Sequence, residues 1–139
     1  GEMADRGDLQ AVSALLAMLD DPDEQVRLRA VGAIHKVALP GNAEVGRALV
    51  ASIGDTSSEV RALALPSAAA HVERGDEGLI RVAKLALRDQ DKQVRKAACE
   101  ALGKACVQGD KESARELLKV CKRDGEDPFV SLAANVAGK

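Results

Sequence analysis

The chain has 139 residues, a formal net charge of -2, and neither tryptophan nor tyrosine. Although 46% of its residues are apolar, Phe129 is its single aromatic residue, so small aliphatic side chains must form the core, which suits closely packed helices better than strands. The slightly acidic balance gives no general attraction for polyanions. No apolar run approaches the ~20 residues needed to span a bilayer, so we expect no membrane partner.

The cysteines argue against a secreted, disulfide-linked domain. There are three of them, Cys99, Cys106 and Cys121, and an odd set without metal-ligand spacing favours a reducing compartment. We therefore expect a cytoplasmic protein. Cys99 and Cys106 are seven residues apart on one helical face, where we expect them to be small core residues.

A 34-residue repeat organises the sequence. The pair Val-Arg recurs at Val26-Arg27, Val60-Arg61 and Val94-Arg95. An aspartate precedes each pair and an alanine follows it at fixed distances, giving Asp21, Asp55 and Asp89 and then Ala30, Ala64 and Ala98. A second marker keeps the same step, at Gly7-Asp8, Gly41-Asn42, Gly75-Asp76 and Gly109-Asp110.

In chain order, residues 1–6 are expected to be the tail of a preceding helix. Apolar residues at helical intervals then predict a first helix over 8–19 and a second over 21–38. Asp21, Pro22 and Glu24 form a capping pattern at the start of the second helix.

The next two units repeat this arrangement. Their first helices are predicted over 42–53 and 76–87, and Thr56 with Glu59 offers the capping pattern in the second unit. The glycine of the second marker is expected to end each second helix in the left-handed conformation, and the next residue to cap the following helix. The predicted units are 7–40, 41–74, 75–108 and 109–139.

The fourth unit departs from the repeat. One residue is inserted between Asp110 and Asp124, and Phe129-Val130 replaces the Val-Arg pair. The array is therefore expected to end or to change its geometry here.

The segment LALRDQDKQVRKAACEALGKA, residues 85–105, resembles the HEAT repeat, especially the short bacterial type also found in phycobilisome lyase subunits. The resemblance covers nearly the whole chain. It implies an all-α fold, a right-handed α-solenoid of about four antiparallel helix pairs in one domain, 1–139. It also implies that hydrogen bonds between repeats involve Asp21, Asp55, Asp89, Arg27, Arg61 and Arg95.

The ends of the chain fall at the same phase of the repeat, because Gly1 aligns with Gly103 and so does Gly138. Terminal repeats of a finished solenoid usually have a polar outer face, which Val130 and Val136 do not give the last helix. We therefore expect an excerpt from a longer array, with neighbouring repeats as its partners.

Residues with catalytic chemistry are scarce. His35 and His71, the two histidines, are not at equivalent repeat positions, and neither belongs to the His-Glu pair by which HEAT-like hydroxylases hold iron. With two histidines in the chain, we expect no Ser-His-Asp or Cys-His catalytic site. We expect no enzyme activity, no cofactor and no metal. Arg74-Gly75-Asp76 matches an integrin-binding tripeptide, but the helix-stop and helix-cap pattern already accounts for it.

The second unit carries the candidate binding surface. Its second helix is apolar where those of the other units are mixed or charged, and the resemblance implies that second helices line the concave face. The candidate partner-binding residues are Arg29, Leu63, Pro66, Ala70 and Lys96. Pro66 removes a backbone donor and is expected to bend the helix. The competing interpretation is that this surface packs within the array itself.

These patterns favour a scaffold or adaptor segment that binds a protein or peptide. One alternative, suggested by the repeat resemblance alone, is a bilin-lyase-type accessory subunit. Another is weak nucleic-acid binding, which is disfavoured because only unit 75–108 carries net positive charge.

Overall fold

The computed structural model describes residues 2–37, 43–105 and 110–124. These residues form helices and turns, with no strand among them. The helices are α1 (Glu2–Met18), α2 (Glu24–Val37), α3 (Ala43–Ser52), α4 (Ser58–His71), α5 (Glu77–Ala86), α6 (Lys92–Ala105) and α7 (Lys111–Asp124).

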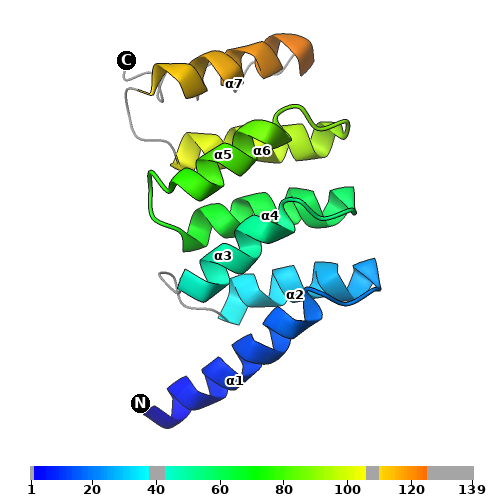
Figure 1. The fold of residues 1–139 in the computed structure, drawn as a ribbon, viewed down its shortest axis with the longest axis vertical. Helices are drawn as coiled ribbons and strands as arrows, with labels where there is room; N and C mark the ends of the chain where they lie inside the picture. Colours follow the sequence, from blue (N-terminus) through cyan, green and yellow to red (C-terminus); the bar gives the residue numbers. More distant parts are fainter. Residues whose placement is uncertain (1, 38–42, 106–109, 125–139) are drawn as a thin grey trace.

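Helical hairpins stack in chain order along the long axis of the molecule (Figure 1). α1 packs on α2, α3 on α4, and α5 on α6, while α4 also packs against both α2 and α6. α1 and α7 lie at opposite ends of the stack. The predicted all-α solenoid of helix pairs is therefore confirmed.

The core repeats with the 34-residue step, because each hairpin buries equivalent positions against the next one. The alanines that follow the Val-Arg pairs are fully buried, and so are Val31, Leu65 and Cys99, which occupy one repeat position. Cys99 is thus a core residue, as predicted, while Cys106 lies outside the described residues. The largest fully buried side chains are Ile34, Leu49, Leu65, Leu79, Leu87, Leu102 and Leu117. Burying each contributes roughly 1.5–3 kcal/mol.

The first helix is longer than predicted. α1 runs without interruption from Glu2 to Met18, so Gly7 does not end a helix and Asp8 does not cap one. The expected break after residue 6 is therefore wrong. A glycine inside a helix costs only about 1 kcal/mol relative to alanine, which is too little to break a helix of this length.

The second helices begin later than predicted, because each is preceded by a side-chain turn. The Asp21 carboxylate accepts a hydrogen bond from the Asp23 backbone N–H at 2.8 Å, and α2 begins at Glu24. The Asp21–Glu24 capping box is therefore wrong. Aspartate favours this local bond to the backbone two residues ahead.

The second hairpin repeats the turn. Asp55 accepts from the Ser57 N–H at 2.8 Å, and Ser57 caps α4 by accepting from the Val60 N–H. Ser57 thus takes the place that the sequence analysis assigned to Thr56.

Arginine bridges join each hairpin to the next. The Arg27 guanidinium in α2 donates to both carboxylate oxygens of Asp55, at 2.9 and 3.1 Å. It also donates to the backbone carbonyls of Asp21 and Pro22, in the turn before its own helix, at 2.8 and 3.0 Å. One side chain therefore links the turns of two successive hairpins.

The same bridge recurs one repeat later. Arg61 donates to the two oxygens of Asp89 at 2.8 and 3.2 Å, and to the carbonyls of Asp55 and Thr56 at 2.8 and 3.1 Å. Two parallel charge-assisted bonds fix both distance and orientation. The bridges between repeats expected for Arg27 and Arg61 are confirmed.

Arg95 makes the equivalent bonds to the turn before its own helix. It is buried and donates to the carbonyls of Asp89 and Gln90 at 2.8 and 3.0 Å. The irregular part of the fourth unit, including Phe129 and Val130, lies outside the described residues, as do Gly41, Asn42 and Gly109.

The bridge changes the acidity of Asp55. Burial would raise its pKa, but hydrogen bonds from Arg27 and from the Ser57 N–H outweigh burial and lower the pKa below the ordinary 3.8. The hydrogen bond to Asp55 likewise raises the pKa of Arg27. The pair is therefore charged at neutral pH.

Aspartate caps begin two of the first helices, as predicted. Asp76 accepts from the Leu79 N–H at 2.9 Å at the start of α5. Asp110 accepts from the N–H and hydroxyl of Ser113 at 3.1 and 2.8 Å at the start of α7. Burial would raise the pKa of Asp110, but these bonds outweigh it and lower the pKa.

Gly75 has a left-handed backbone, with φ of 89°, as expected. However, α4 ends at His71, so the glycine reverses the turn into α5 rather than ending the helix. Its N–H donates to the Ala105 carbonyl at the end of α6, which fixes the turn against the hairpin. None of the described helices is both long and apolar enough to cross a membrane.

Stability should depend on pH through Asp55. We predict that Asp55→Asn lowers the free energy of unfolding at neutral pH by about 1 kcal/mol, a value kept small by partial solvent screening. The pKa of Asp55 is lower in the folded chain than its ordinary value of 3.8. The stabilisation from the Asp55 carboxylate is therefore complete above the ordinary pKa and is lost as the pH falls through the pKa of the folded state. Urea unfolding at several pH values should therefore show the difference from wild type closing below about pH 4. Glu59→Gln, on an exposed residue, is the control, and a gap independent of pH would contradict the assignment.

Replacing Gly75 or Gly32 by alanine should change the free energy of unfolding in opposite directions. Gly75→Ala should destabilise the chain by about 1–2 kcal/mol, because its φ is unfavourable for an L-residue. Gly32→Ala should stabilise it by up to about 1 kcal/mol, because Gly32 lies within α2 and an added Cβ would be 3.9 Å from the nearest atom, in Leu63. Denaturant unfolding measures both, and equal effects would show that backbone conformation is not the cause.

Candidate functional site

The helices form two layers with different surfaces. We call α2, α4 and α6 the second-helix layer, and α1, α3, α5 and α7 the first-helix layer. Helices of the second-helix layer pack against one another more closely than those of the first. The first-helix layer is correspondingly hollowed between its helices, with cavities lined by α1 and α3, by α3 and the α4–α5 turn, and by α5 and α7.

The five predicted site residues all lie on the second-helix layer. Arg29 projects from α2 and Lys96 from α6, and both are exposed. Leu63, Pro66 and Ala70 belong to α4 between them, where Leu63 and Pro66 are half-buried and Ala70 is exposed. Neither Arg29 nor Lys96 forms an ion pair with any residue the structure describes. The structure therefore places an apolar strip of α4 between two helices that each carry a cation without an ion-pair partner among the described residues.

Leu63 has two roles at once. It packs against the core and lies beside Gly32 of α2, since a Cβ built on Gly32 would be 3.9 Å from Leu63 Cδ2. Part of its side chain still reaches solvent. Leu63 therefore packs against the core and α2 while part of its side chain stays accessible, so packing and exposure are not exclusive alternatives.

Pro66 lies inside α4, and the helix continues past it to His71. Proline has no N–H, so the Ala62 carbonyl, four residues earlier, lacks its usual helical donor. The bend expected at Pro66 stays a prediction.

The two histidines meet although they are not at equivalent repeat positions. Their ring centroids are 5.8 Å apart at an interplanar angle of 66°, where the last turns of α2 and α4 approach. His35 is exposed and His71 is buried. The Nδ1 atom of His71 is 2.8 Å from the Ser67 carbonyl, so this nitrogen carries the proton, and Nε2 has no hydrogen-bond partner within the described structure.

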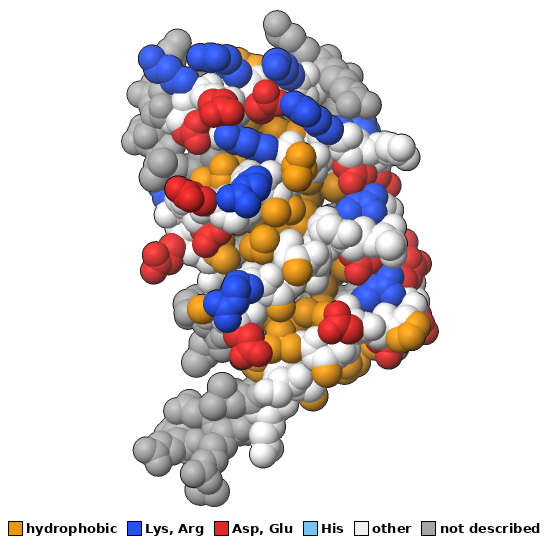
Figure 2. All heavy atoms as spheres, viewed as in Figure 1, with side chains coloured by type: hydrophobic (Ala, Val, Ile, Leu, Met, Phe, Trp, Pro, Cys, Tyr) orange, Lys and Arg blue, Asp and Glu red, His pale blue; other side chains and the backbone are white. Residues whose placement is uncertain are grey.

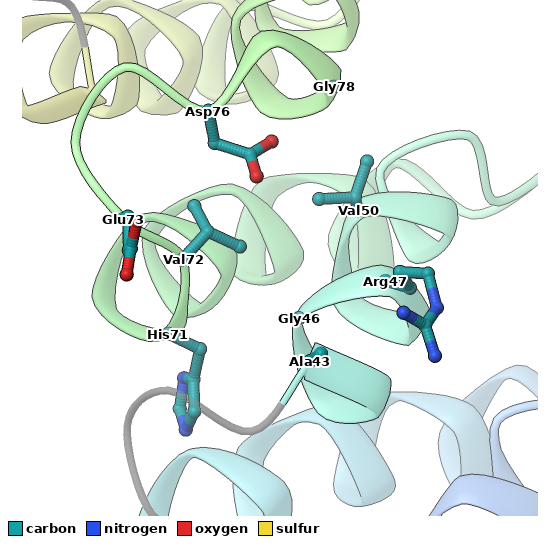
Figure 3. A pocket seen from close by; sticks show the side chains of 9 residues that line it. All are labelled: Ala43, Gly46, Arg47, Val50, His71, Val72, Glu73, Asp76 and Gly78. Carbon is teal, nitrogen blue, oxygen red and sulfur yellow. The ribbon is translucent and has the colours of Figure 1, made fainter.

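A cavity of about 390 Å³ lies beside His71, between α3 and the turn from α4 to α5 (Figure 3). At one edge of the cavity α3 approaches the turn closely, since a Cβ built on Gly46 would be only 3.0 Å from Val72 Cγ1. Asp76 faces this space, but its carboxylate is occupied as the cap of α5. In Figure 3 the His71 ring points toward α2 rather than into the cavity. The lining therefore does not form a catalytic constellation.

Among the described residues, no group of three or more histidine, cysteine or acidic side chains could hold a metal ion.

The known family explains this geometry. A family model described as HEAT repeats matches residues 46–137, well over half of the chain, and this region includes the bridge from Arg61 to Asp89. The chain belongs to the HEAT-repeat family. HEAT repeats generally mediate protein–protein interaction and are typically non-enzymatic scaffolds. No curated protein matches the sequence.

Sequence reasoning missed features on the opposite, first-helix layer of this HEAT protein. Leu85 is the most exposed of the large apolar side chains described, at 65%. The sequence contains an indication of this exposed leucine, because the equivalent positions one and two repeats earlier hold alanines, Ala51 and Ala17. A leucine that replaces exposed alanines is not required for packing.

Replacing His71 tests whether its unpartnered nitrogen has a role in folding. An unsatisfied buried acceptor costs about 1–3 kcal/mol, so we predict that His71→Phe leaves the free energy of unfolding unchanged or raises it by about 1 kcal/mol. Thermal and denaturant unfolding measure this, with His35→Phe as the exposed control. A loss above about 1 kcal/mol would contradict this prediction and show that the hydrogen bonds of the His71 ring, including the one from Nδ1 to the Ser67 carbonyl, outweigh the cost of burying Nε2.

Proposed function

We propose that this chain is an interaction segment of a longer HEAT array, and that it binds an extended protein or peptide on the second-helix layer. The contact would centre on Leu63 and Pro66 of α4, with Ala70 beside them and Arg29 and Lys96 on the neighbouring helices. In a HEAT solenoid this layer would line the concave face, which is the surface that such arrays use for extended partners.

One observation carries the proposal: apolar surface of α4 stays accessible between cations that the described residues do not neutralise. Accessible apolar surface favours a protein partner, because burying it releases water. The flanking cations favour acceptor groups such as carboxylates or backbone carbonyls at the edges of the contact. Such polar rims set orientation and association rate more than affinity.

We further propose that residues 1–139 form one domain with repeats near 7–40, 41–74, 75–108 and 109–139, in a cytoplasmic protein. The helix boundaries support the middle divisions, since α3 begins at Ala43, α5 at Glu77 and α7 at Lys111.

Surface charge reversal tests the binding face. A displayed random-peptide library is selected against the immobilised wild-type chain, and each recovered peptide is titrated against variants. We predict that Arg29→Glu with Lys96→Glu, and separately Ala70→Asp, weaken binding at least ten-fold, about 1.4 kcal/mol, without a change in melting temperature. Leu63→Asp would be ambiguous, because the same side chain packs against the core.

Arg81→Glu with Arg88→Glu, on the first-helix layer, is the matched control, and only the peptides that still bind it are used to test the second-helix layer. Among the peptides that still bind this control, binding to the Ala70 and Arg29/Lys96 variants as tightly as to wild type would contradict the proposed face. The same proteins titrated with a linear tetrapyrrole, or with duplex DNA at increasing salt, test the two alternatives, because phosphate contacts weaken steeply with salt.

A further inference from the structure

The first-helix layer carries an apolar side chain that the fold does not need. Leu85 in α5 is 65% exposed, whereas the other exposed large apolar residues, Met18 and Leu118, are each 38% exposed. Alanine occupies its position in the two preceding repeats, at Ala17 and Ala51, and is exposed there too. Leu85 therefore adds exposed apolar surface at a position that is also exposed in the two preceding repeats.

Leu85 lies in a cleft rather than on a flat surface. The cleft has a volume of about 780 Å³ and lies between α5 and α7, with Ile80 as a second apolar side chain in its lining. The cleft is widely open to solvent, which suits an extended segment better than an enclosed small ligand. Figure 2 shows apolar side chains along the middle of this face, with basic side chains gathered around them in its upper part.

Arginines flank the exposed leucine. Arg81 is four residues before Leu85 and Arg88 three residues after it, so all three share one side of the helix. Both arginines are exposed, both line the cleft, and neither forms an ion pair with a described residue. Arg47 and Arg115, one repeat before and after Arg81, are exposed as well and extend the row across three helices.

Most of the acids in the cleft are already engaged. Glu112 pairs with Lys84 across the cleft at 3.8 Å, and Glu116 pairs with Lys119 at 3.5 Å.

The remaining acids in the lining are Asp110 and Glu77. Asp110 is hydrogen-bonded to Ser113 as the cap of α7. Glu77 lies in the first turn of α5, where it complements the helix dipole. The cleft thus combines an exposed apolar residue with guanidinium groups that lack partners within the described structure.

We propose that this cleft is a second interaction site, which binds an acidic protein segment. An apolar side chain of the partner would lie against Leu85 and Ile80, and carboxylates on either side of it would pair with Arg81 and Arg88. The forked guanidinium group suits bidentate pairing with carboxylates. This site is on the opposite layer from the surface proposed above, and it does not depend on that proposal.

The cleft fits a peptide better than a nucleic acid. A phosphate backbone has no apolar group to cover Leu85, and single-stranded nucleic acids bind to aromatic platforms, whereas this chain has one aromatic residue in 139 and a net charge of -2. An acidic segment with an apolar anchor uses both kinds of group in the cleft.

A designed probe tests the proposal. The probe is a fluorescent peptide with one leucine flanked on both sides by glutamates, and its binding to the isotope-labelled full chain is followed by anisotropy and by amide NMR shifts. We expect saturable binding, with shifts confined to α5 and α7. A peptide with serine in place of leucine should bind at least ten-fold more weakly. A lysine-flanked peptide should not bind.

Variants locate the binding groups. We expect two variants to weaken binding of the probe at least ten-fold: Leu85→Ser, and the double variant Arg81→Glu with Arg88→Glu. The melting temperature should not change, because all three residues are exposed. Arg29→Glu with Lys96→Glu should bind it like wild type. The proposal is overturned by non-saturable shifts, by shifts in α2 and α4 instead, or by a single-stranded oligonucleotide that binds more tightly than the probe.

Discussion

The structure depends on one recurring interaction, the arginine that joins the turn of its own hairpin to the turn of the next. No single hairpin covers its apolar face, so the stack must hold neighbours in register. Arg27 and Arg61 do this with a forked pair of bonds to an aspartate and further bonds to two carbonyls. Because the aspartate also organises the turn before its own helix, the same residue shapes one hairpin and attaches it to the previous one.

Much of this architecture could be predicted, since the repeat itself records which residues must be equivalent. The spacing of the Val-Arg pairs, together with the family resemblance, is enough to predict the bridging residues Arg27 and Arg61 and their aspartate partners. Helix ends were less predictable. Asp21 matches both a helix cap and a side-chain turn, and only the competing bond to the Asp23 N–H separates them. Gly7 matches a helix stop, yet α1 continues through it because one glycine costs little.

The candidate surfaces show where sequence reasoning stops. It placed Arg29, Leu63 and Lys96 on one layer correctly, but exposure depends on neighbours in space. Leu63 lies beside Gly32, which belongs to another repeat, and such a neighbour cannot be read from the sequence of one repeat. The cleft at Leu85 depends on the spacing between α5 and α7, which the sequence does not contain, although Leu85 itself stands out from Ala17 and Ala51 at the equivalent positions. Both surfaces follow from the same design, in which closely packed second helices leave the first helices apart.

The most direct measurement is a double-mutant cycle on Arg61 and Asp89, with alanine at each position and at both, followed by denaturant unfolding. If the bridge couples neighbouring hairpins, the double variant should lose about 1 kcal/mol less than the sum of the single losses, beyond the ~0.5 kcal/mol scatter expected of independent sites. Strictly additive losses would contradict the account, because the hairpins would then be held together by apolar contact alone.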